Sequence, residues 1–420
     1  MNPFYEKAQT LESLIMDWKT MAPKPYNKCE ANPYTRTRVI LMNGTEFEQN
    51  WFMHMFSRNC PDNEARRELA LLRRLEKQQQ MLISALKPTD ETVLEHTIGY
   101  EQLAVDLTAQ LAQHEPDMYV KNALDFALLE DFDHLYRYAD LMSMDTGAKA
   151  ENYVGRYTEI MPGRPTISHH RHPFDSVKYH IDNKTAELQT KLCVGIITAA
   201  EQQTMNYYMN VNGFYTNDRG RRLYQEIGMV EEQHVTHYGS LLDPKATWFE
   251  NLVMRQYTEC YLYYSCMQTE TDENIKRIWQ MLFEQEISHL HAAAKMLEKY
   301  EGKHWQSVVG SGEFPKPLML TSNIDYVREV LSATVQNTAC REGYVCVNDL
   351  EGSADFFRYQ NTVNNDVKQV VSHTVIEDHI RKFGEDYRFE TAKNPIEELR
   401  SRVKDNTDVG RTKTAILLRG

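Results

Sequence analysis

Three segments of the chain each carry an acidic residue three positions before a histidine. Residues three apart on an α-helix lie on one face, so a carboxylate and an imidazole at this spacing can bind one ion together. A single glutamate precedes each pair by 27 to 30 residues. The three sets are Glu101 with Asp131 and His134, Glu201 with Glu231 and His234, and Glu259 with Glu286 and His289.

The repetition of these sets separates them from isolated acid–histidine pairs. The first two sets match position by position, at a constant offset of 100 residues, and the third set is about one helical turn shorter. A fourth pair, Glu301 and His304, stands beside a glycine and has no matched partner. We therefore interpret the fourth pair as incidental and the three repeated sets as a possible metal site.

The surroundings of the three pairs explain why an ion would be needed. Apolar runs precede the pairs, and these read LDFALL, IGMV and WQMLF. Carboxylates grouped in such surroundings repel one another and are poorly solvated, so they need a cation, or protons and hydrogen bonds. Two divalent metal ions would meet this need. The alternative is a helical scaffold with buried acid–histidine hydrogen bonds and no metal.

The elements that carry these residues are predicted to be helices. Glycine (18) and proline (14) are scarce, and the long stretches between them show apolar residues at helical spacing, which predicts an all-α fold. Each glutamate and its acid–histidine pair flank a predicted turn, so they reach a similar height in an antiparallel hairpin. The predicted hairpins join 91–113 to 118–142, 184–212 to 218–242, and 246–268 to 273–300.

The remaining sequence predicts extensions around these hairpins. Asp218 and Asp272 stand where a helix N-cap is expected. We expect an N-terminal helical extension over 1–88, a helical bundle over 89–300 and a C-terminal helical extension over 301–420. Within the extensions, the predicted helices cover about 4–20, 45–58, 63–86, 323–340 and 365–383.

The repeated Glu … E-x-x-H pattern resembles that of the ferritin-like di-iron carboxylate superfamily, over roughly residues 90–300. This resemblance implies a ferritin-like four-helix bundle core built from helical hairpins, with an extra hairpin and the two extensions. The chain departs from the family in two ways. It offers three hairpins where the family needs two, and it has Asp131 where the family usually has glutamate.

The resemblance also implies the roles of the residues. The acids of the pairs would bridge two metal ions, the single glutamates would each cap one ion, and the histidines would each bind one. Iron is the favoured metal and manganese the alternative, because oxygen and nitrogen ligands suit both. The implied function is an oxidoreductase that activates O2 or peroxide. Its electrons would come from an external electron donor or a small-molecule substrate. The alternative is a non-catalytic scaffold or an iron-handling protein.

The connections between hairpins indicate which two form the site. Ferritin-like bundles join their hairpins by a long crossover. The stretch 143–180 is long enough for this, whereas 243–245 is only a tight turn. We therefore expect the first hairpin to pair with the second; the third hairpin as its partner, a short-linked bundle and a second site stay open. The candidate ligands are Glu101, Asp131, His134, Glu201, Glu231 and His234, with Glu259, Glu286, His289 and Glu130 as alternative or additional ligands.

Several aromatic residues lie near these ligands in the sequence. Hydrogen bonds around a metal are one interpretation, and ordinary packing of amphipathic rings in the core is the other. The residues concerned are Tyr138, Tyr238, His237, Tyr208 and Tyr263.

Charge and cysteine content narrow the classes of function. A formal charge of −13 argues against nucleic acid or an anionic membrane as a partner, and no apolar run is long enough to span a bilayer. The seven cysteines include no C-x-x-C pair, so we expect reduced thiols, no built-in rubredoxin carrier and a cytoplasmic protein. A homo-oligomer remains open.

Overall fold

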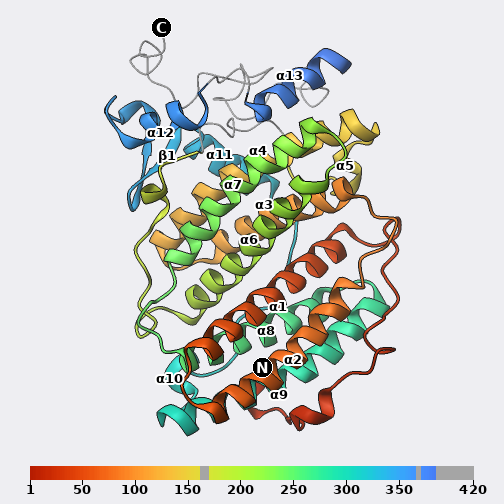
Figure 1. Cartoon of the computed structure of the whole chain (residues 1–420), viewed down its shortest axis with the longest axis vertical. Coiled ribbons are helices and arrows are strands. Elements are labelled where there is room, and N and C mark those ends of the chain that lie inside the picture. The colour runs from red at the N-terminus through yellow and green to blue at the C-terminus, as the bar shows by residue number, and fades with distance from the viewer. Residues whose placement is uncertain (161–169, 366–369, 385–420) are drawn as a thin grey trace. The chain divides into compact units, whose positions relative to one another are not determined.

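The computed structural model describes residues 1–160, 170–365 and 370–384, and it is predominantly helical (Figure 1). Within these residues, the only sheet pairs two short antiparallel strands, β1 (Asn337–Cys340) and β2 (Gly343–Cys346). The predicted helical fold class is confirmed at this level. The last part of the predicted C-terminal extension, residues 385–420, lies outside the described residues.

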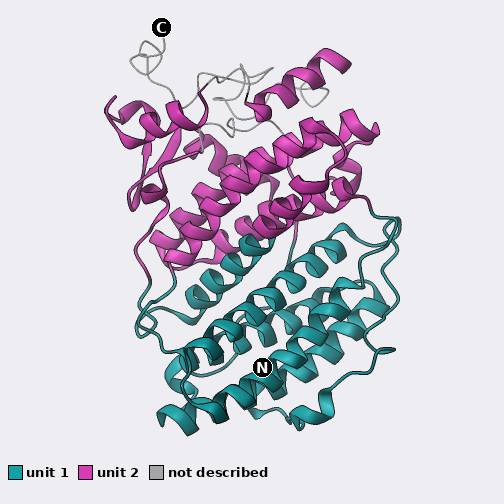
Figure 2. Ribbon diagram, viewed as in Figure 1, with its two compact units in different colours: residues 1–91, 181–203, 242–320 teal, residues 92–180, 204–241, 321–420 magenta. Residues whose placement is uncertain are grey.

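Contacts divide the chain into two compact units, each assembled from separate segments (Figure 2). Unit 1 contains Met1–Glu91, Ile181–Gln203 and Leu242–Leu320, and unit 2 contains Thr92–His180, Thr204–Leu241 and Thr321–Gly420. The helix α6 (Leu188–Phe214) contributes residues to both units.

Four long helices dominate unit 1. They are α1 (Pro33–Asn59), α2 (Asn63–Ser84), α8 (Trp248–Thr269) and α9 (Glu273–Glu301). Helix α1 packs against α2 and α8, and α9 packs against α8 and α2. As predicted, Asp272 caps α9, because its side chain accepts hydrogen bonds from the backbone amides of Asn274 and Ile275. A short helix, α10 (Gln306–Val309), follows.

The described part of unit 2 contains three long helices besides its part of α6. They are α3 (Val93–His114), α4 (Met118–Thr146) and α7 (Asp218–Ser240). Helix α4 packs against both α3 and α7. Shorter elements complete the unit: α5 (Ala150–Tyr153), η4 (Pro173–Ser176), α11 (Ile324–Thr334), η5 (Val347–Asp349), α12 (Asp355–Val363) and α13 (Val371–Phe383).

The helices of the three predicted hairpins begin and end within a few residues of the predicted bounds. Helix α1 does not, because it begins at Pro33, well before the helix predicted over 45–58. The cap of α7 is an exception, because Asn217 rather than Asp218 accepts the hydrogen bond from the backbone amide of Gly220. Asp218 is instead the first helical residue.

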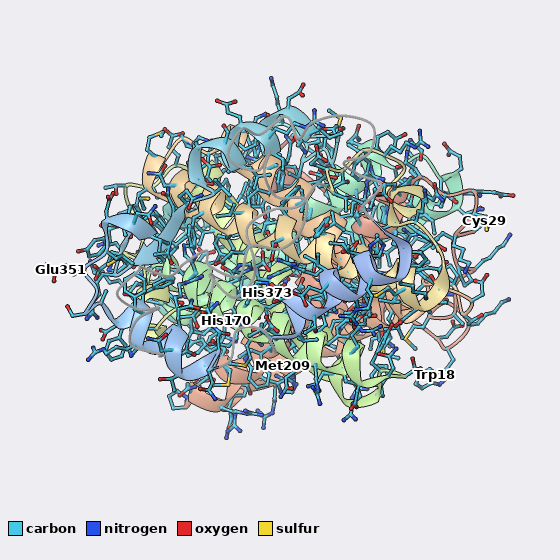
Figure 3. All side chains as sticks on the ribbon, turned by 90° about the horizontal axis from the view of Figure 1, so that it is seen from above. Trp18, Cys29, His170, Met209, Glu351 and His373 are labelled. Carbon is cyan, nitrogen blue, oxygen red and sulfur yellow. The ribbon has the colours of Figure 1, made fainter. Side chains whose placement is uncertain are left out.

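The prediction of a helix over 4–20 is wrong. This segment forms only two short 3-10 turns, η1 (Pro3–Tyr5) and η2 (Leu11–Leu14). Tertiary contacts override its helical tendency: the ring of Phe4 stacks on Trp305 with centroids 3.8 Å apart, and the backbone amide of Met16 donates to the side chain of Gln78. Trp18 and Cys29, which follow these turns in the sequence, are exposed at the surface (Figure 3).

The predicted helix over 323–340 ends early. Its last residues form β1, which pairs with the β-branched and aromatic residues of β2. Arg341 has φ 52°, in the left-handed region that reverses the chain between the strands.

All seven cysteines are free thiols. Within the described residues, no helix is both long enough and apolar enough to cross a bilayer.

Candidate metal centres

In unit 2, the carboxylate of Glu231 lies between two imidazole rings. Its Oε1 is 2.9 Å from Nδ1 of His134, and its Oε2 is 3.1 Å from Nδ1 of His234. The two ring centroids are 5.9 Å apart. Each oxygen of one carboxylate therefore faces a different histidine.

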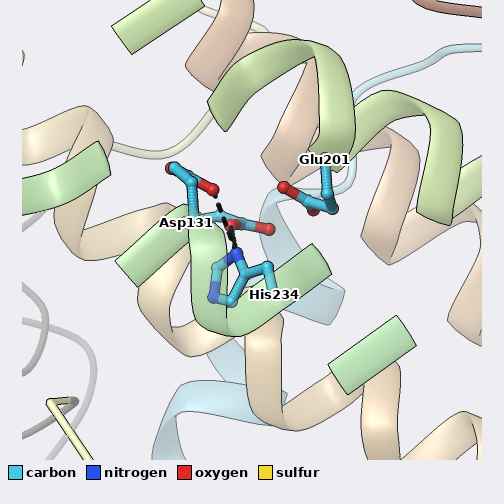
Figure 4. A group of neighbouring side chains, drawn as sticks. Asp131, Glu201 and His234 are labelled. Atoms are coloured by element: carbon cyan, nitrogen blue, oxygen red, sulfur yellow. Dashed lines mark ion pairs between the residues drawn. The ribbon is translucent and has the colours of Figure 1, made fainter. Parts of the chain in front are cut away.

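Helical spacing and the packing of α4 against α7 produce this arrangement. Asp131 and His134 share one face of α4, while Glu231 and His234 share one face of α7. Nδ1 of His234 lies 3.3 Å from Oδ1 of Asp131, so the two acid–histidine pairs meet (Figure 4). Figure 4 also shows the carboxylate of Glu201 on α6 directed toward Asp131 and His234.

The ligand atoms form two groups, in each of which they lie within 4.8 Å of one another. Asp131, Glu201, Glu231 and His234 form one group, and Glu101, His134 and Glu231 form the other. All these side chains are buried. Glu231 belongs to both groups, so the two groups share one carboxylate. We call these six residues the unit 2 group, because five of them belong to unit 2 and the sixth, Glu201, stands on α6, the helix that contributes residues to both units.

Glu231 and His134 are close but not hydrogen-bonded. Among the described residues, neither oxygen of Glu231 and neither ring nitrogen of His134 makes a hydrogen bond of acceptable geometry. A buried polar group left in this state costs about 1–3 kcal/mol, and more when it is charged. A cation would satisfy these atoms together, so the unit 2 group could hold metal ions.

The histidines govern the charge of the shared carboxylate. Burial acts to raise the pKa of Glu231, but His134 and His234 outweigh burial and lower that pKa to about 2. Glu231 is therefore ionised at neutral pH, as a metal ligand must be.

Glu130, predicted as an alternative or additional ligand, makes two hydrogen bonds in the structure. Nε2–H of His234 donates to its Oε2 at 2.6 Å, and Nη1–H of Arg171 donates to its Oε1 at 2.7 Å. Glu130 is absent from both ligand groups. It holds the nitrogen of His234 opposite Nδ1, so it orients that ring.

The tyrosines near the unit 2 group differ in their hydrogen bonds. Tyr208 OH donates a short hydrogen bond to Oε1 of Glu101. The buried hydroxyl of Tyr138 finds no hydrogen-bond partner among the described residues, and its ring packs on those of Tyr208 and Tyr224. Burial, followed by the charge of Glu101, raises the pKa of Tyr208 well above its usual value.

His237 and Tyr238 lie further along α7. Nε2 of His237 is 2.7 Å from the hydroxyl of Tyr344, and burial lowers the pKa of His237 well below its usual value. The ring of Tyr238 stacks on that of His237 and lies edge-on to His234. Neither residue belongs to a ligand group among the described residues.

The third predicted set lies in unit 1 and meets partners that the sequence did not suggest. Glu259 of α8 and Glu286 and His289 of α9 are buried with Glu76 of α2 and Glu46 of α1. Tyr263, the remaining aromatic candidate, donates a short hydrogen bond to Oε1 of Glu46. We call Glu46, Glu76, Glu259, Glu286 and His289 the unit 1 group.

Mutual repulsion and burial shift the pKa values of residues in the unit 1 group. Burial, then the neighbouring carboxylate of Glu76, raises the pKa of Glu286 to about 7 despite the opposing effect of His289. Burial lowers the pKa of His289, but Glu286 and Glu76 outweigh burial and raise it to about 10. Burial and neighbouring acids also hold the pKa values of Glu46 and Glu259 well above the usual range.

Sequence reasoning missed Glu46 and Glu76. The run that contains Glu76 reads as a strongly charged helix with a solvated face, yet Glu76 and Gln79 are fully buried. A signal was present, because Glu76 stands three residues before Gln79, and glutamine replaces the histidine of the repeated motif.

Comparison with known proteins adds no family to this description. No protein-family model, curated protein or solved structure matches the chain. The chain is therefore identified as a helical protein with buried acid–histidine groups that could bind metal.

Proposed function

We propose that the unit 2 group is a dinuclear metal centre of the ferritin-like di-iron carboxylate type. The carboxylate of Glu231, with one oxygen toward each of two histidines, is the observation that carries this proposal. The four helices involved, α3, α4, α6 and α7, correspond to the first and second predicted hairpins. Ferritin-like bundles place the same residue types on facing helices.

The donor set fits two divalent ions. The unit 2 group combines the four carboxylates of Glu101, Asp131, Glu201 and Glu231 with two imidazoles. Two divalent cations would balance these four negative charges in a setting that excludes water. Mixed oxygen and nitrogen ligands suit iron and manganese, and we favour iron.

We propose further that the protein is an oxidoreductase that uses O2 or peroxide. When bound, two reduced metal ions supply the electron pair for this chemistry. The chain supplies the setting: burial excludes water, Tyr208 fixes Glu101 by a hydrogen bond, and Glu130 fixes the ring of His234. Since all cysteines are free and none form a C-x-x-C pair, electrons would return from an external donor or a small-molecule substrate.

Rapid mixing of the Fe(II)-loaded full chain with O2 or hydrogen peroxide tests this function. We expect fast oxidation in the wild type, repeated turnover when a reductant is added, and loss of both in Glu231→Gln. The matched control is Glu232→Gln, which changes an exposed carboxylate on the same helix. A single oxidation with no turnover would contradict the oxidoreductase and support iron handling instead.

A further inference from the structure

We infer that unit 1 carries a second metal centre, in which Glu76 is shared between a histidine-containing position and an all-oxygen position for hard divalent cations. This inference goes beyond the proposed function, because it concerns other helices and does not require the unit 2 group to bind metal.

The histidine-containing position is formed by α2 and α9. Nδ1 of His289 lies 2.8 Å from Oε1 of Glu286 and 3.1 Å from Oε1 of Glu76. All three side chains are fully buried, and their ligand atoms lie within 4.8 Å of one another. Among the described residues, neither oxygen of Glu286 and neither nitrogen of His289 makes a hydrogen bond of acceptable geometry. A cation would satisfy these atoms together.

The all-oxygen position is formed by Glu46, Glu76 and Glu259, from α1, α2 and α8. In each of these carboxylates a protein donor holds one oxygen. Tyr263 OH donates to Oε1 of Glu46, while Nε2 of Gln256 donates to Oε1 of Glu76 at 2.9 Å and to Oε2 of Glu259 at 2.7 Å.

The second oxygen of each carboxylate is left for a ligand. Within the described part of the chain, Oε2 of Glu46, Oε2 of Glu76 and Oε1 of Glu259 are buried and accept no hydrogen bond. Each of the three carboxylates thus has one oxygen fixed by the protein and one that is unsatisfied. Together they form a preorganised site for a cation that prefers oxygen ligands.

Nearby basic residues do not neutralise the unit 1 group. Arg255, whose charge acts on Glu259, forms its ion pair with Glu48 at 3.0 Å. The buried arginines Arg36 and Arg38 form ion pairs with Glu91 and Glu270. In the described ranges, His289 is the one basic side chain that forms an ion pair with any of the four carboxylates. Buried charges that lack such compensation cost several kcal/mol each.

The composition of the unit 1 group predicts a harder ion than in unit 2. Gln79 occupies the position three residues after Glu76, where the motif has histidine, and its Nε2 donates to Oε1 of Gln285 at 3.0 Å. The unit 1 group therefore offers four carboxylates and one imidazole. Oxygen-rich sites suit Mg²⁺ and Mn²⁺, so we assign it to hard divalent cations with Mn²⁺ as the probe.

A cavity borders one residue of the all-oxygen position. Its volume is about 270 Å³, and its lining includes Glu259 together with Thr45, Gln49, Met254 and Thr258. The cavity therefore adjoins the unit 1 group, while Oε1 of Glu259 itself is buried.

Manganese binding to the metal-free full chain tests this inference. Equilibrium dialysis with Mn²⁺ and elemental analysis would compare the wild type, Glu231→Gln and Glu76→Gln. We expect each variant to lose about half of the bound Mn²⁺ and the double variant to lose nearly all. Glu284→Gln, an exposed change two residues before Glu286 on α9, should bind like the wild type.

The outcomes separate this inference from the proposed function. If Glu231→Gln binds no Mn²⁺, the second centre is refuted, and this result does not depend on whether Glu76→Gln folds. Wild-type binding by a folded Glu76→Gln would refute it as well. Wild-type binding by Glu231→Gln, together with loss in Glu76→Gln, would leave the second centre standing and remove the metal centre proposed for unit 2.

Discussion

Oε2 of Glu130 accepts a hydrogen bond of 2.6 Å from Nε2–H of His234. The bond places the proton of the imidazole on Nε2 and leaves Nδ1 facing Glu231 and Asp131, at 3.1 and 3.3 Å. Arg171 donates to the other oxygen of Glu130, at 2.7 Å, so the orienting carboxylate is itself held in place. Carboxylates in this position raise the basicity of a histidine ligand.

Glu130→Gln should therefore weaken metal binding in unit 2 without removing a ligand. The amide oxygen can still accept from His234, but it carries no charge, and changes of this kind typically cost about 10–100-fold in metal affinity. Competition titration with a chelator measures the effect. Glu232→Gln is the control, and equal affinities in the two variants would show that Glu130 does not orient the ligand.

The two histidines of unit 2 should make equal contributions. His134 faces one oxygen of Glu231 and His234 faces the other. His134→Ala and His234→Ala should each lose about one of two ions in unit 2, as in two-metal sites generally. Elemental analysis of the purified variants provides the count. His304→Ala alters an exposed histidine at the incidental pair, and it should retain all the metal.

Tyr138 and Tyr208 should respond in opposite ways to loss of the hydroxyl. The hydroxyl of Tyr138 is buried and unsatisfied within the described residues, so Tyr138→Phe should be neutral or stabilising by about 1 kcal/mol. Tyr208 donates to Glu101, so Tyr208→Phe should destabilise the protein by about 1–2 kcal/mol. Denaturant unfolding of the metal-free proteins compares the two. Equal effects would mean that the hydrogen bond to Glu101 contributes nothing.

The metal-free protein should lose stability as pH rises. The pKa of Glu286 is raised from 4.5 to about 7, and that of His289 from 6.5 to about 10. Each group holds more protons in the folded than in the unfolded chain between those values, so the free energy of unfolding falls across both ranges. A loss of about 1 kcal/mol corresponds to a fall of about 2–4 °C in melting temperature.

Thermal melts of the metal-free chain between pH 5 and pH 9 test whether stability falls as pH rises. Glu286→Gln should flatten the dependence below pH 7, because the titrating group is gone. Saturating Mn²⁺ should abolish this fall in stability, since a bound cation keeps Glu286 ionised and His289 neutral. A melting temperature that rises with pH in the metal-free protein would contradict the assignment of the raised pKa values.

Periodicity predicted the helices of the three hairpins well, because their apolar faces repeat at helical spacing and their turns carry capping residues, but it missed the first part of α1, which begins at Pro33. Asp272 and Asn217 mark the starts of α9 and α7, although the second cap was assigned one residue too late. The segment around Phe4 could not be predicted in this way. Its conformation depends on stacking against Trp305, about three hundred residues away in the sequence.

The residues of the candidate sites, too, could be predicted only where a local sequence pattern marks them. Asp131, His134, Glu231 and His234 were found because each helix displays an acid–histidine pair on one face. Glu76 was missed because glutamine follows it at the third position, and Glu46 because a lone glutamate on a helix has no local signature. Only the packing of α1 and α2 with α8 and α9 brings these two acids to Glu259, Glu286 and His289.

The metal content of the full chain, measured before and after loss of Glu231, tests the central claim most directly. The protein should bind iron or manganese, and Glu231→Gln should lose about two ions per chain, because both positions in unit 2 share this carboxylate. A folded wild-type chain that remains metal-free after incubation with Fe²⁺ and Mn²⁺ would contradict the account.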